Sequence, residues 1–279
     1  MSALKRSLRL DAAAIGARAL DALRAELQLH PKPGLVSFVD SGAHDDMDAQ
    51  TFVRSIAALD EYFPAIAEAG ATTKPFAVLQ RLGLDAEQKM LAATGGVNTH
   101  RGAIFCLGLL VAAAGHAFAR GLPCDGDALT RIALELWGAD IAAAAARAGE
   151  SHGARAVRAY GVRGAREEFL AGLPVLNQVA LPALKQAFRL TGCSERARAH
   201  ALFAIMSELQ DTNLLHRGGW EGLVYVQRAA RAFLAQGSVL HPGWRACALK
   251  LHGDCVALNL SPGGAADTLA AAIFLVSLS

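Results

Sequence analysis

The chain has 279 residues, of which 53% are hydrophobic and only 6% aromatic, and its formal net charge is +2. This length supports a substantial hydrophobic core. Because Lys and Arg are scattered rather than clustered, the composition argues against a nucleic-acid partner and against a membrane-surface partner. Ala and Leu are frequent and favour helices, so we expect packed helices rather than a β-sandwich.

Apolar residues recur at helical spacing along most of the chain. Phe52, Ile56, Leu59 and Phe63, for example, lie at positions i, i+4, i+7 and i+11. In chain order the pattern predicts helices at residues 8–29, 48–69, 73–91, 99–119, 126–149, 174–190, 194–210, 219–235, 244–258 and 264–277. Only Leu35–Val39 looks extended, because a Pro-Lys-Pro-Gly run precedes it.

Two features bear on where the protein works. Gly102–Ala119 has no Asp, Glu, Lys or Arg, but it is short for a membrane span and rich in Gly and Ala, which favours a core helix. The 5 cysteines include no C-x-x-C pair, so we expect free thiols in a reducing cytosol. No apolar stretch follows Lys5 and Arg6, so we expect no signal peptide and a cytoplasmic protein.

Polar loops separate the predicted helices and hold most of the Gly, His and Asp clusters. The loops are Pro31–Asp48, Thr94–Gly102, Glu150–Glu168, Glu208–Gly219 and Asn259–Asp267. Loops on a rigid scaffold often carry the chemistry of an enzyme. We therefore expect an all-α fold, a single compact all-helical catalytic domain over residues 1–279 with polar active-site loops between its helices.

The stretch Gly95–Gly102 is typical of a loop that holds an anion. The two glycines at its start, Gly95 and Gly96, allow a ligand to approach the backbone. Asn98 or Thr99 can cap the following helix, whose free N–H groups favour an anion, and Arg101 adds a charged fork. The alternative is an ordinary capped helix start after a Gly turn.

The run that begins at Ser261 repeats this arrangement. Ser261 suits the N-cap of a helix, and the following proline suits its first turn. Gly263 and Gly264 again permit a close approach of a ligand. Asp267 either takes part in such a site or complements the dipole of the first helical turn.

Three carboxylates crowd the run from His44 to Asp48. Asp45, Asp46 and Asp48 repel one another unless something offsets their charge, and a divalent cation with a triphosphate does so. The alternative is a solvated helix start, with Asp46 or Asp48 as its cap.

A second acidic group ends a strongly periodic helix. Glu208 and Asp211 are spaced i and i+3, which predicts a shared helical face. Acidic residues at a helix C-terminus oppose the helix dipole, which favours a functional interpretation over a plain Gly stop. The neighbouring Asn213, Arg217 and Gly218 add polar groups and a flexible turn.

A further polar run surrounds Arg163. Arg163 and Arg166 can hold phosphates, while Glu167 or Glu168 can accept a proton or hold a metal through water. Surface salt bridges at a helix start are the alternative. Signatures of a nucleophile elbow, a zinc protease, a Walker loop and a dinucleotide-binding loop do not occur in the sequence.

Together these loops resemble the triphosphoribosyl-dephospho-coenzyme A synthase family over about residues 25–275. The matching stretches are Pro31–Val36, Gly42–Asp48, Gly96–Phe105, Tyr160-Gly161 with Arg163-Gly164, Asp211–Gly219 and Ser261–Asp267. The resemblance implies that ATP and 3′-dephospho-CoA react to give 2′-(5″-triphosphoribosyl)-3′-dephospho-CoA and adenine. This product is the precursor of an acyl-carrier prosthetic group, which a separate transferase attaches.

The resemblance also implies Mg²⁺, allows a homodimer, and favours the malonate decarboxylase branch over the citrate lyase branch because of Leu35-Val36-Ser37. Residues expected to bind the nucleotide are Lys32, Gly96, Asn98, Thr99, Arg101, Arg163, Asn213, Arg217, Gly218, Ser261, Gly263 and Gly264. Expected metal ligands are Asp45, Asp48, Glu208, Asp211 and Asp267. Expected catalytic residues are His44, Asp46, His100, Asp211 and Glu167.

Two other functions fit parts of the sequence. The His44-Asp45 dipeptide is compatible with a helical metal-dependent nucleotide phosphohydrolase, which would release phosphate rather than adenine. A non-catalytic helical binding protein would show no turnover, and its polar loops would tolerate alanine.

Overall fold

The computed structural model describes residues 11–146 and 152–278, and within these ranges the regular elements are all helical. The α-helices are α1 (Ala12–Leu27), α2 (Ala49–Ala58), α3 (Tyr62–Ala71), α4 (Phe76–Ala93), α5 (Arg101–Arg120), α6 (Gly126–Ala146), α7 (His152–Tyr160), α8 (Ala165–Leu170), α9 (Leu181–Thr191), α10 (Ser194–Glu208), α11 (Thr212–Ala235), α12 (Trp244–Ala257) and α13 (Gly263–Ser277). A π-helical turn, η1 (Val175–Ala180), precedes α9, and a 3-10 turn, η2 (Ser238–Leu240), follows α11. The predicted all-α class is confirmed.

Helix α5 forms the centre of one half of the molecule, where it contacts α1, α3, α6 and α13. Its contact with α3 is so close that the two backbones touch. A Cβ on Gly70 would lie 1.8 Å from the carbonyl oxygen of Ala112, and one on Gly115 would lie 2.0 Å from that of Ala67. By length and composition α5 could cross a membrane, but 72% of its apolar window is buried inside the fold, as predicted for a core helix.

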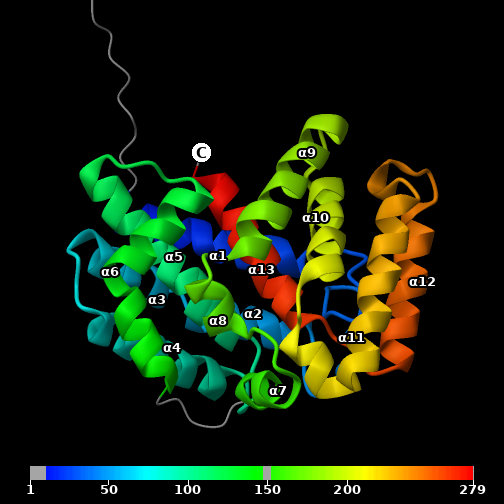
Figure 1. Ribbon diagram of the computed structural model, residues 1–279, viewed down its shortest axis with the longest axis horizontal. Helices are drawn as coiled ribbons and strands as arrows, with labels where there is room; N and C mark the ends of the chain where they lie inside the picture. Colours follow the sequence, from blue (N-terminus) through cyan, green and yellow to red (C-terminus); the bar gives the residue numbers. More distant parts are fainter. Residues whose placement is uncertain (1–10, 147–151, 279) are drawn as a thin grey trace, which may run out of the picture.

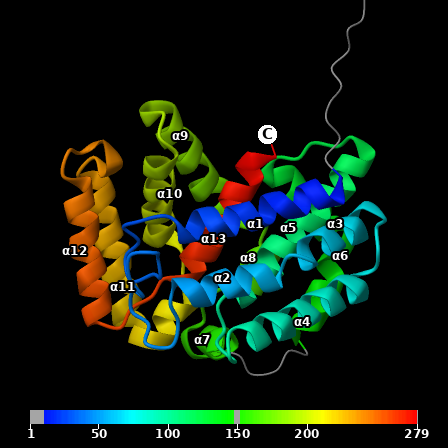
Figure 2. The same ribbon diagram turned by 180° about the vertical axis from the view of Figure 1, so that it is seen from behind.

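Helix α13 runs through the middle of the molecule (Figure 1). It contacts α1 and α5 on one side and α10 on the other, so it joins the half built from α1–α6 to the half built from α9–α12. Figure 2 shows α1 crossing over α13, with the α1–α2 loop lying beside α11 and α12. Because α5, α11 and α13 begin in the same region, the polar loops that precede them are brought together.

Several predicted boundaries were wrong. The predicted helix 48–69 is two helices, because Pro64 has no N–H to continue the helix and is tolerated only in the first turn of α3. Residues 150–168, predicted as a loop, contain the short polar helices α7 and α8. Leu35–Val39 is irregular backbone with bends, not a strand. Residues 8–10 and 147–149 of two predicted helices lie outside the described residues.

The loop predicted at Glu208–Gly219 is much shorter in the structure. Helix α10 ends at Glu208, and α11 begins at Thr212, so only a few residues separate them. Gly219 lies inside α11, where its backbone (φ 60°, ψ −161°) interrupts the helix. Such a conformation strongly favours glycine, which explains why the sequence pattern pointed to a helix start there.

Candidate active site

Arg217, in the second turn of α11, connects this helix to two loops that are far apart in the sequence. Its Nη1 donates to the carbonyl oxygen of Ala43 at 2.7 Å and to Oδ1 of Asn259 at 2.5 Å. Its Nη2 donates to Nδ1 of His44 at 2.9 Å. A single guanidinium group therefore holds the α1–α2 loop, the start of α11 and the α12–α13 loop together.

His44 completes this contact. Its Nε2 lies 2.8 Å from Oγ of Ser261. Because a guanidinium cannot accept a hydrogen bond, Nδ1 must be the acceptor for Arg217, which leaves the ring proton on Nε2, directed at Ser261. Burial, and then the charge of Arg217, lower the pKa of His44, so the imidazole is neutral near pH 7. The three side chains of His44, Arg217 and Ser261 are called the Arg217 cluster below.

Close packing of two loops supports the Arg217 cluster. A Cβ on Gly34 would lie 2.1 Å from the carbonyl oxygen of Leu260, so the turn after Pro33 lies directly against the α12–α13 loop. A Cβ on Gly218 would lie 2.4 Å from Cδ2 of Leu260. At Gly34, where the neighbour is backbone, glycine is therefore needed for packing between the two loops, which is a more specific reason than a close approach of substrate.

The three aspartates that follow His44 in the α1–α2 loop have two different surroundings. Asp45 and Asp46 are exposed, and their charges raise the pKa of Arg217 against the lowering effect of burial. Oδ1 of Asp46 lies 3.3 Å from Nδ1 of His44. Asp48 instead caps α2 in a capping box, accepting from the amide of Thr51 at 2.8 Å. The alternative interpretation of Asp48 as a helix cap is therefore what the structure shows.

Asp211 is the N-cap of α11 and is 2% exposed. Its Oδ1 accepts from the amide of Asn213 at 2.8 Å, and its Oδ2 accepts from the amide of Ala265 in α13 at 3.0 Å. Burial raises its pKa, and these amides act in the opposite direction. Glu208 does not share a helical face with Asp211, because α10 ends between them; Glu208 pairs with Arg231 at 3.5 Å on the surface.

Asp267, in the first turns of α13, faces the start of α5. The amide of Ala103 lies close enough to lower the pKa of this carboxyl group, and a Cβ on Gly102 would lie 2.1 Å from its Oδ2. Burial, followed by the charges of Glu26 and Asp211, raises its pKa well above the usual value. Asp267 and Asp211 therefore lie near each other, between the beginnings of α5, α11 and α13.

The Gly95–Gly102 stretch is both a helix start and an open turn. Asn98 accepts from the amide of Arg101 at 3.1 Å, as predicted for a cap. Nε of Arg101 contacts Oε2 of Glu87 at 3.0 Å, so its charge is already paired. Gly95 and Gly96 have positive φ, and a Cβ on either would meet no atom of the described residues within 4 Å. The turn is thus open to a ligand at its glycines rather than at Arg101.

His100 is enclosed rather than presented to a substrate. It is 3% exposed, its Nδ1 lies 2.6 Å from Oγ of Ser55, and its ring meets Phe52 edge-on. Thr99 donates to the same Ser55 hydroxyl at 2.6 Å. Burial, and then the charge of Lys32, lower the pKa of His100 to about 3, so the ring does not titrate near neutrality. These contacts weigh against the predicted proton-transfer role.

Lys32 is 1% exposed and pairs with Glu26 of α1, Nζ to Oε1 at 2.6 Å. Glu26 is 5% exposed, so the whole ion pair is inside the protein. Burial lowers the pKa of Lys32, and Glu26 raises it. The predicted contact of Lys32 with phosphate would require this pair to open.

Helix α8 separates its two glutamates. Glu167 accepts from the amide of Gly164 at 2.9 Å and thereby caps α8. Glu168 is buried, accepts from the amide of Val175 at 3.0 Å, and lies 3.6 Å from Nε of Arg163. Glu168, rather than the predicted Glu167, is the inward-facing carboxylate of this segment.

Comparison with known proteins gives the family. The ATP:dephospho-CoA triphosphoribosyl transferase family matches residues 12–279. The chain belongs to this family. It is 44% identical over 263 residues to a probable 2-(5″-triphosphoribosyl)-3′-dephosphocoenzyme-A synthase of Azotobacter vinelandii, covering 92% of this chain and 88% of that one. It is 40% identical over 257 residues to the protein of that name in Acinetobacter calcoaceticus, again covering 92% and 88%. No solved structure matches the chain.

Family membership confirms the sequence-based prediction of an enzyme of the triphosphoribosyl-dephospho-CoA synthase kind. It does not separate a malonate decarboxylase branch from a citrate lyase branch. The non-catalytic alternative finds no support in these relatives, and neither does the phosphohydrolase.

The predicted metal ligands of this transferase are not gathered into one cluster. Among residues 11–146 and 152–278, no group of three or more His, Cys, Asp and Glu side chains is arranged to hold a metal ion. Asp48 and Asp211 cap helices, and Glu208 lies at the surface. Asp45 and Asp46 remain as exposed carboxylates beside the Arg217 guanidinium.

Sequence reasoning missed three residues of the candidate site. They are Glu26, Ser55 and Asn259, which contact Lys32, His100 and Arg217, respectively. Glu26 lies on the buried face of α1, three residues after Leu23, and this place of a carboxylate on an apolar face was the available signal. The others carry no distinctive spacing, because their importance comes from tertiary contact.

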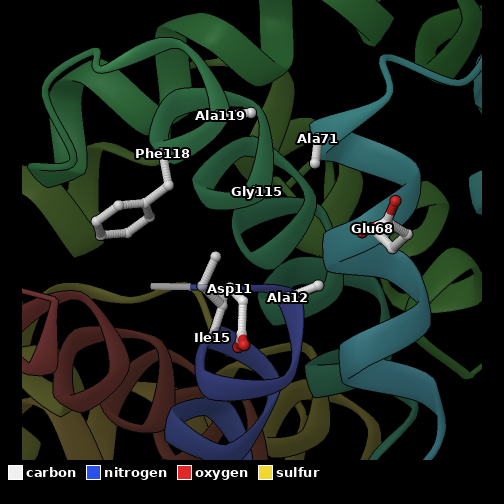
Figure 3. A pocket seen from close by; sticks show the side chains of 8 residues that line it. All are labelled: Asp11, Ala12, Ile15, Glu68, Ala71, Gly115, Phe118 and Ala119. Atoms are coloured by element: carbon white, nitrogen blue, oxygen red, sulfur yellow. The ribbon is translucent and has the colours of Figure 1, made fainter. Parts of the chain in front are cut away.

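A cavity of about 210 Å³ lies away from these loops (Figure 3). Its lining is Asp11, Ala12, Ile15, Glu68, Ala71, Gly115, Phe118 and Ala119. Gly115 is far along α5 from Arg101, about 21 Å at the rise of an α-helix. This cavity is therefore separate from the Arg217 cluster.

Proposed function

We propose that the protein transfers the triphosphoribosyl group of ATP to 3′-dephospho-CoA and releases adenine. A ribose hydroxyl of 3′-dephospho-CoA attacks the anomeric carbon of ATP, and the glycosidic bond to adenine breaks. The hydroxyl proton passes to a base, and adenine leaves with a proton from the solvent or the protein. The observation that carries this proposal is the convergence of the α1–α2 loop, the α12–α13 loop and the start of α11 on the Arg217 cluster, in a chain of this transferase family.

Guanidinium groups supply the charge for the triphosphate. Arg217 is partly enclosed, and a phosphate oxygen would form a stronger charge-assisted bond there than in open water. Arg163 is half exposed, at the edge of the same region, where its backbone amide donates to the side chain of Gln210 at 3.3 Å. The open turn at Gly95 and Gly96 adds a place where a ligand can reach the backbone.

Mg²⁺ enters this proposal as part of the MgATP substrate. Mg²⁺ usually takes one or two protein carboxylates together with phosphate oxygens and water, so it does not need a cage of protein ligands. Asp45 fits this limited role, because its carboxylate is exposed and close enough to influence Arg217. The bound ion would neutralise charge on the triphosphate.

Asp46 is the carboxylate best placed to act as the base. His44 directs its proton at Ser261, and His100 is neutral and enclosed. Asp211 already accepts amide hydrogen bonds at both oxygens, and Glu167 caps α8. Asp46 keeps an exposed carboxylate beside His44, and carboxylates serve as bases in glycosyl transfer.

Replacing Asp46 with Asn is expected to lower kcat by about 10²-fold while KM for ATP changes only a few-fold, because a base acts in the chemical step. Steady-state adenine release measures both constants. Asp48→Asn is the matched control, since asparagine also caps helices well, and it should behave like the wild type. If Asp46→Asn turns over normally, the base is another group.

The overall reaction has a direct test. Incubation of the protein with ATP, Mg²⁺ and 3′-dephospho-CoA should release adenine in equal amount to the triphosphoribosylated product, measured by liquid chromatography and mass spectrometry. Omitting 3′-dephospho-CoA should stop adenine release. Formation of ADP or phosphate without adenine would rule out the transferase and favour the phosphohydrolase.

We further propose that the product becomes the prosthetic group of the acyl carrier protein of malonate decarboxylase, after transfer by a separate cytoplasmic enzyme. The run Leu35-Val36-Ser37 supports this branch. Ser37 is 2% exposed and accepts from the amide of Val39 at 3.1 Å, so it shapes the α1–α2 loop. Deleting the gene should abolish malonate decarboxylase activity in cells that also make citrate lyase, and leave citrate lyase intact. A homodimer, allowed by the resemblance, is checked by light scattering.

A further inference from the structure

Three helices that bear the site begin close together, and two carboxyl groups lie between their ends, Asp211 buried and Asp267 partly buried. Helices α11 and α13 meet at Asp211, and α13 meets α5 at Asp267. The first turn of a helix carries amide groups without partners inside the helix and a partial positive charge. A carboxylate placed there satisfies the amides and offsets the charge.

Asp211 caps two helices at once. It satisfies the amide of Asn213 in its own helix and the amide of Ala265 in α13, and the amides of Leu214 and Gly264 also lower its pKa. A Cβ on Gly264 would lie 3.1 Å from Oδ2 of Asp211, so a side chain at that position would press on the carboxylate and shift it by a few tenths of an ångström. The carboxylate therefore fixes the distance between the two helix ends.

Asp267 makes the corresponding contact one helix further on. The amide of Ala103, in the first turn of α5, lowers the pKa of Asp267. Gly102 leaves room for this carboxylate, because any Cβ there would overlap Oδ2 of Asp267. The two aspartates thus connect the ends of α11, α13 and α5 in series.

The connected helix ends carry the site described above. Arg217 lies in the second turn of α11, and Ser261 lies just before α13. Arg217 reaches His44 at 2.9 Å, and His44 reaches Ser261 at 2.8 Å, so a shift of one helix end against the other would break these contacts. Displacements of about 1 Å in a binding site can cost a large factor in rate.

We infer that Asp211 and Asp267 are positioning residues, which hold the ends of α5, α11 and α13 in register so that Arg217 and Ser261 bind the triphosphate of ATP. The inference rests on the proposed function, and it replaces the catalytic role predicted for Asp211 and the metal-binding role predicted for both aspartates. Both oxygens of Asp211 already accept from backbone amides, which is what a helix-joining carboxylate requires.

The test compares variants that separate capping of one helix from joining of two. Asp211→Ser keeps one oxygen for the Asn213 amide but has no second oxygen for Ala265. We expect it to raise KM for ATP by about tenfold or more, with kcat within about threefold, because phosphate binding is lost equally in the ground and transition states. Asp211→Asn keeps the shape of the side chain but has one acceptor oxygen in place of two, and it should raise KM for ATP by less than Asp211→Ser does.

Asp125→Ser is the matched control. Asp125 accepts from the amide of Ala128 at 3.0 Å at the start of α6, so it caps one helix and joins none. This variant should keep the wild-type kcat and KM. Gly264→Ala tests the same junction without altering a carboxylate, and it should raise KM for ATP in the same way as Asp211→Ser, since its Cβ presses on Asp211.

Calorimetric binding of inorganic triphosphate gives a readout that does not need turnover, and it should weaken in parallel with KM. Wild-type binding of triphosphate by Asp211→Ser or by Gly264→Ala would overturn the inference. So would a loss of activity that added Mg²⁺ restores, or a change in the pH dependence of kcat, since these belong to a metal ligand and to a base. If the wild type binds triphosphate but releases no adenine, the proposed function fails instead.

Discussion

Replacement of Arg217 with alanine is expected to lower kcat/KM for ATP by about 10³-fold. Besides its bonds to Ala43 and Asn259, the variant loses two charge-assisted hydrogen bonds that act directly in the site, one to the triphosphate and one to His44, and each of these two contributes about 1.5–3 kcal/mol. Their sum, about 4 kcal/mol, corresponds to three powers of ten in rate. The effect should appear in both kcat and KM, because Arg217 both binds substrate and positions the α1–α2 loop.

Replacement of Arg217 with lysine tests the contribution of the positive charge separately from that of the guanidinium geometry. An ammonium group cannot bond Ala43, Asn259 and His44 together, because it lacks the planar fork of the guanidinium. Arg217→Lys should therefore have a kcat/KM for ATP about tenfold higher than that of Arg217→Ala. Arg245→Ala is the control: Arg245 pairs with Glu195 at 2.7 Å on the surface, and its loss should leave kcat/KM unchanged.

Adenine release over a range of ATP concentrations measures these constants, and circular dichroism checks the fold. Activity of Arg217→Ala within threefold of the wild type would remove Arg217 from the triphosphate site. In that case Arg163 would be the next candidate, because its Nε lies 3.6 Å from Glu168, whereas Nε of Arg101 is held more closely by Glu87, at 3.0 Å.

The helical fold was accessible from the sequence because apolar spacing reports which face of a segment is buried. Phe63 and Ile56, used to predict one helix, are indeed buried, but they belong to two helices. The break between α2 and α3 follows from Pro64, whose effect is local and readable. The break in α11 at Gly219 is of a different kind, because a helical pattern continues across it and only the backbone angles reveal it.

The sequence predicted which segments form the candidate site, but it did not predict the role of each residue in them. The sequence gathered His44, Arg217 and Ser261 among its candidates, and the structure brings them within hydrogen-bond distance. It could not show that Asp48 and Asp211 would be used as helix caps, because an aspartate before a helix has the same spacing whether it caps or binds metal. That difference depends on which amide the carboxylate meets after folding.

Glycines illustrate the same limit. Gly96 and Gly264 both suggested a close approach of a ligand. In the structure Gly96 is open, whereas Gly264 lies against the carboxylate of Asp211. A glycine needed for helix packing and one needed for ligand access are identical in sequence, and only the neighbouring chain distinguishes them.

Replacement of Lys32 with methionine is expected to destabilise the protein by about 3–5 kcal/mol, because it leaves the Glu26 carboxylate buried without its partner. Glu26→Leu should lower the free energy of unfolding by a similar amount, because it leaves the Lys32 ammonium group buried without a partner. The double variant Glu26→Leu, Lys32→Met removes both charges, and it should recover most of the loss, since a buried ion pair often does no better than apolar side chains of similar size. Urea unfolding of the four proteins gives the coupling free energy.

The same four proteins decide between two roles for Lys32. If its ammonium group serves only to neutralise Glu26, the double variant should bind ATP with a KM close to that of the wild type. If Lys32 leaves Glu26 to hold a phosphate, as the sequence suggested, Lys32→Met should cost little stability, and KM for ATP should stay high in the double variant. The burial of both side chains and the 2.6 Å contact favour the first result, because opening the pair would leave the Glu26 carboxylate as a buried charge without a partner.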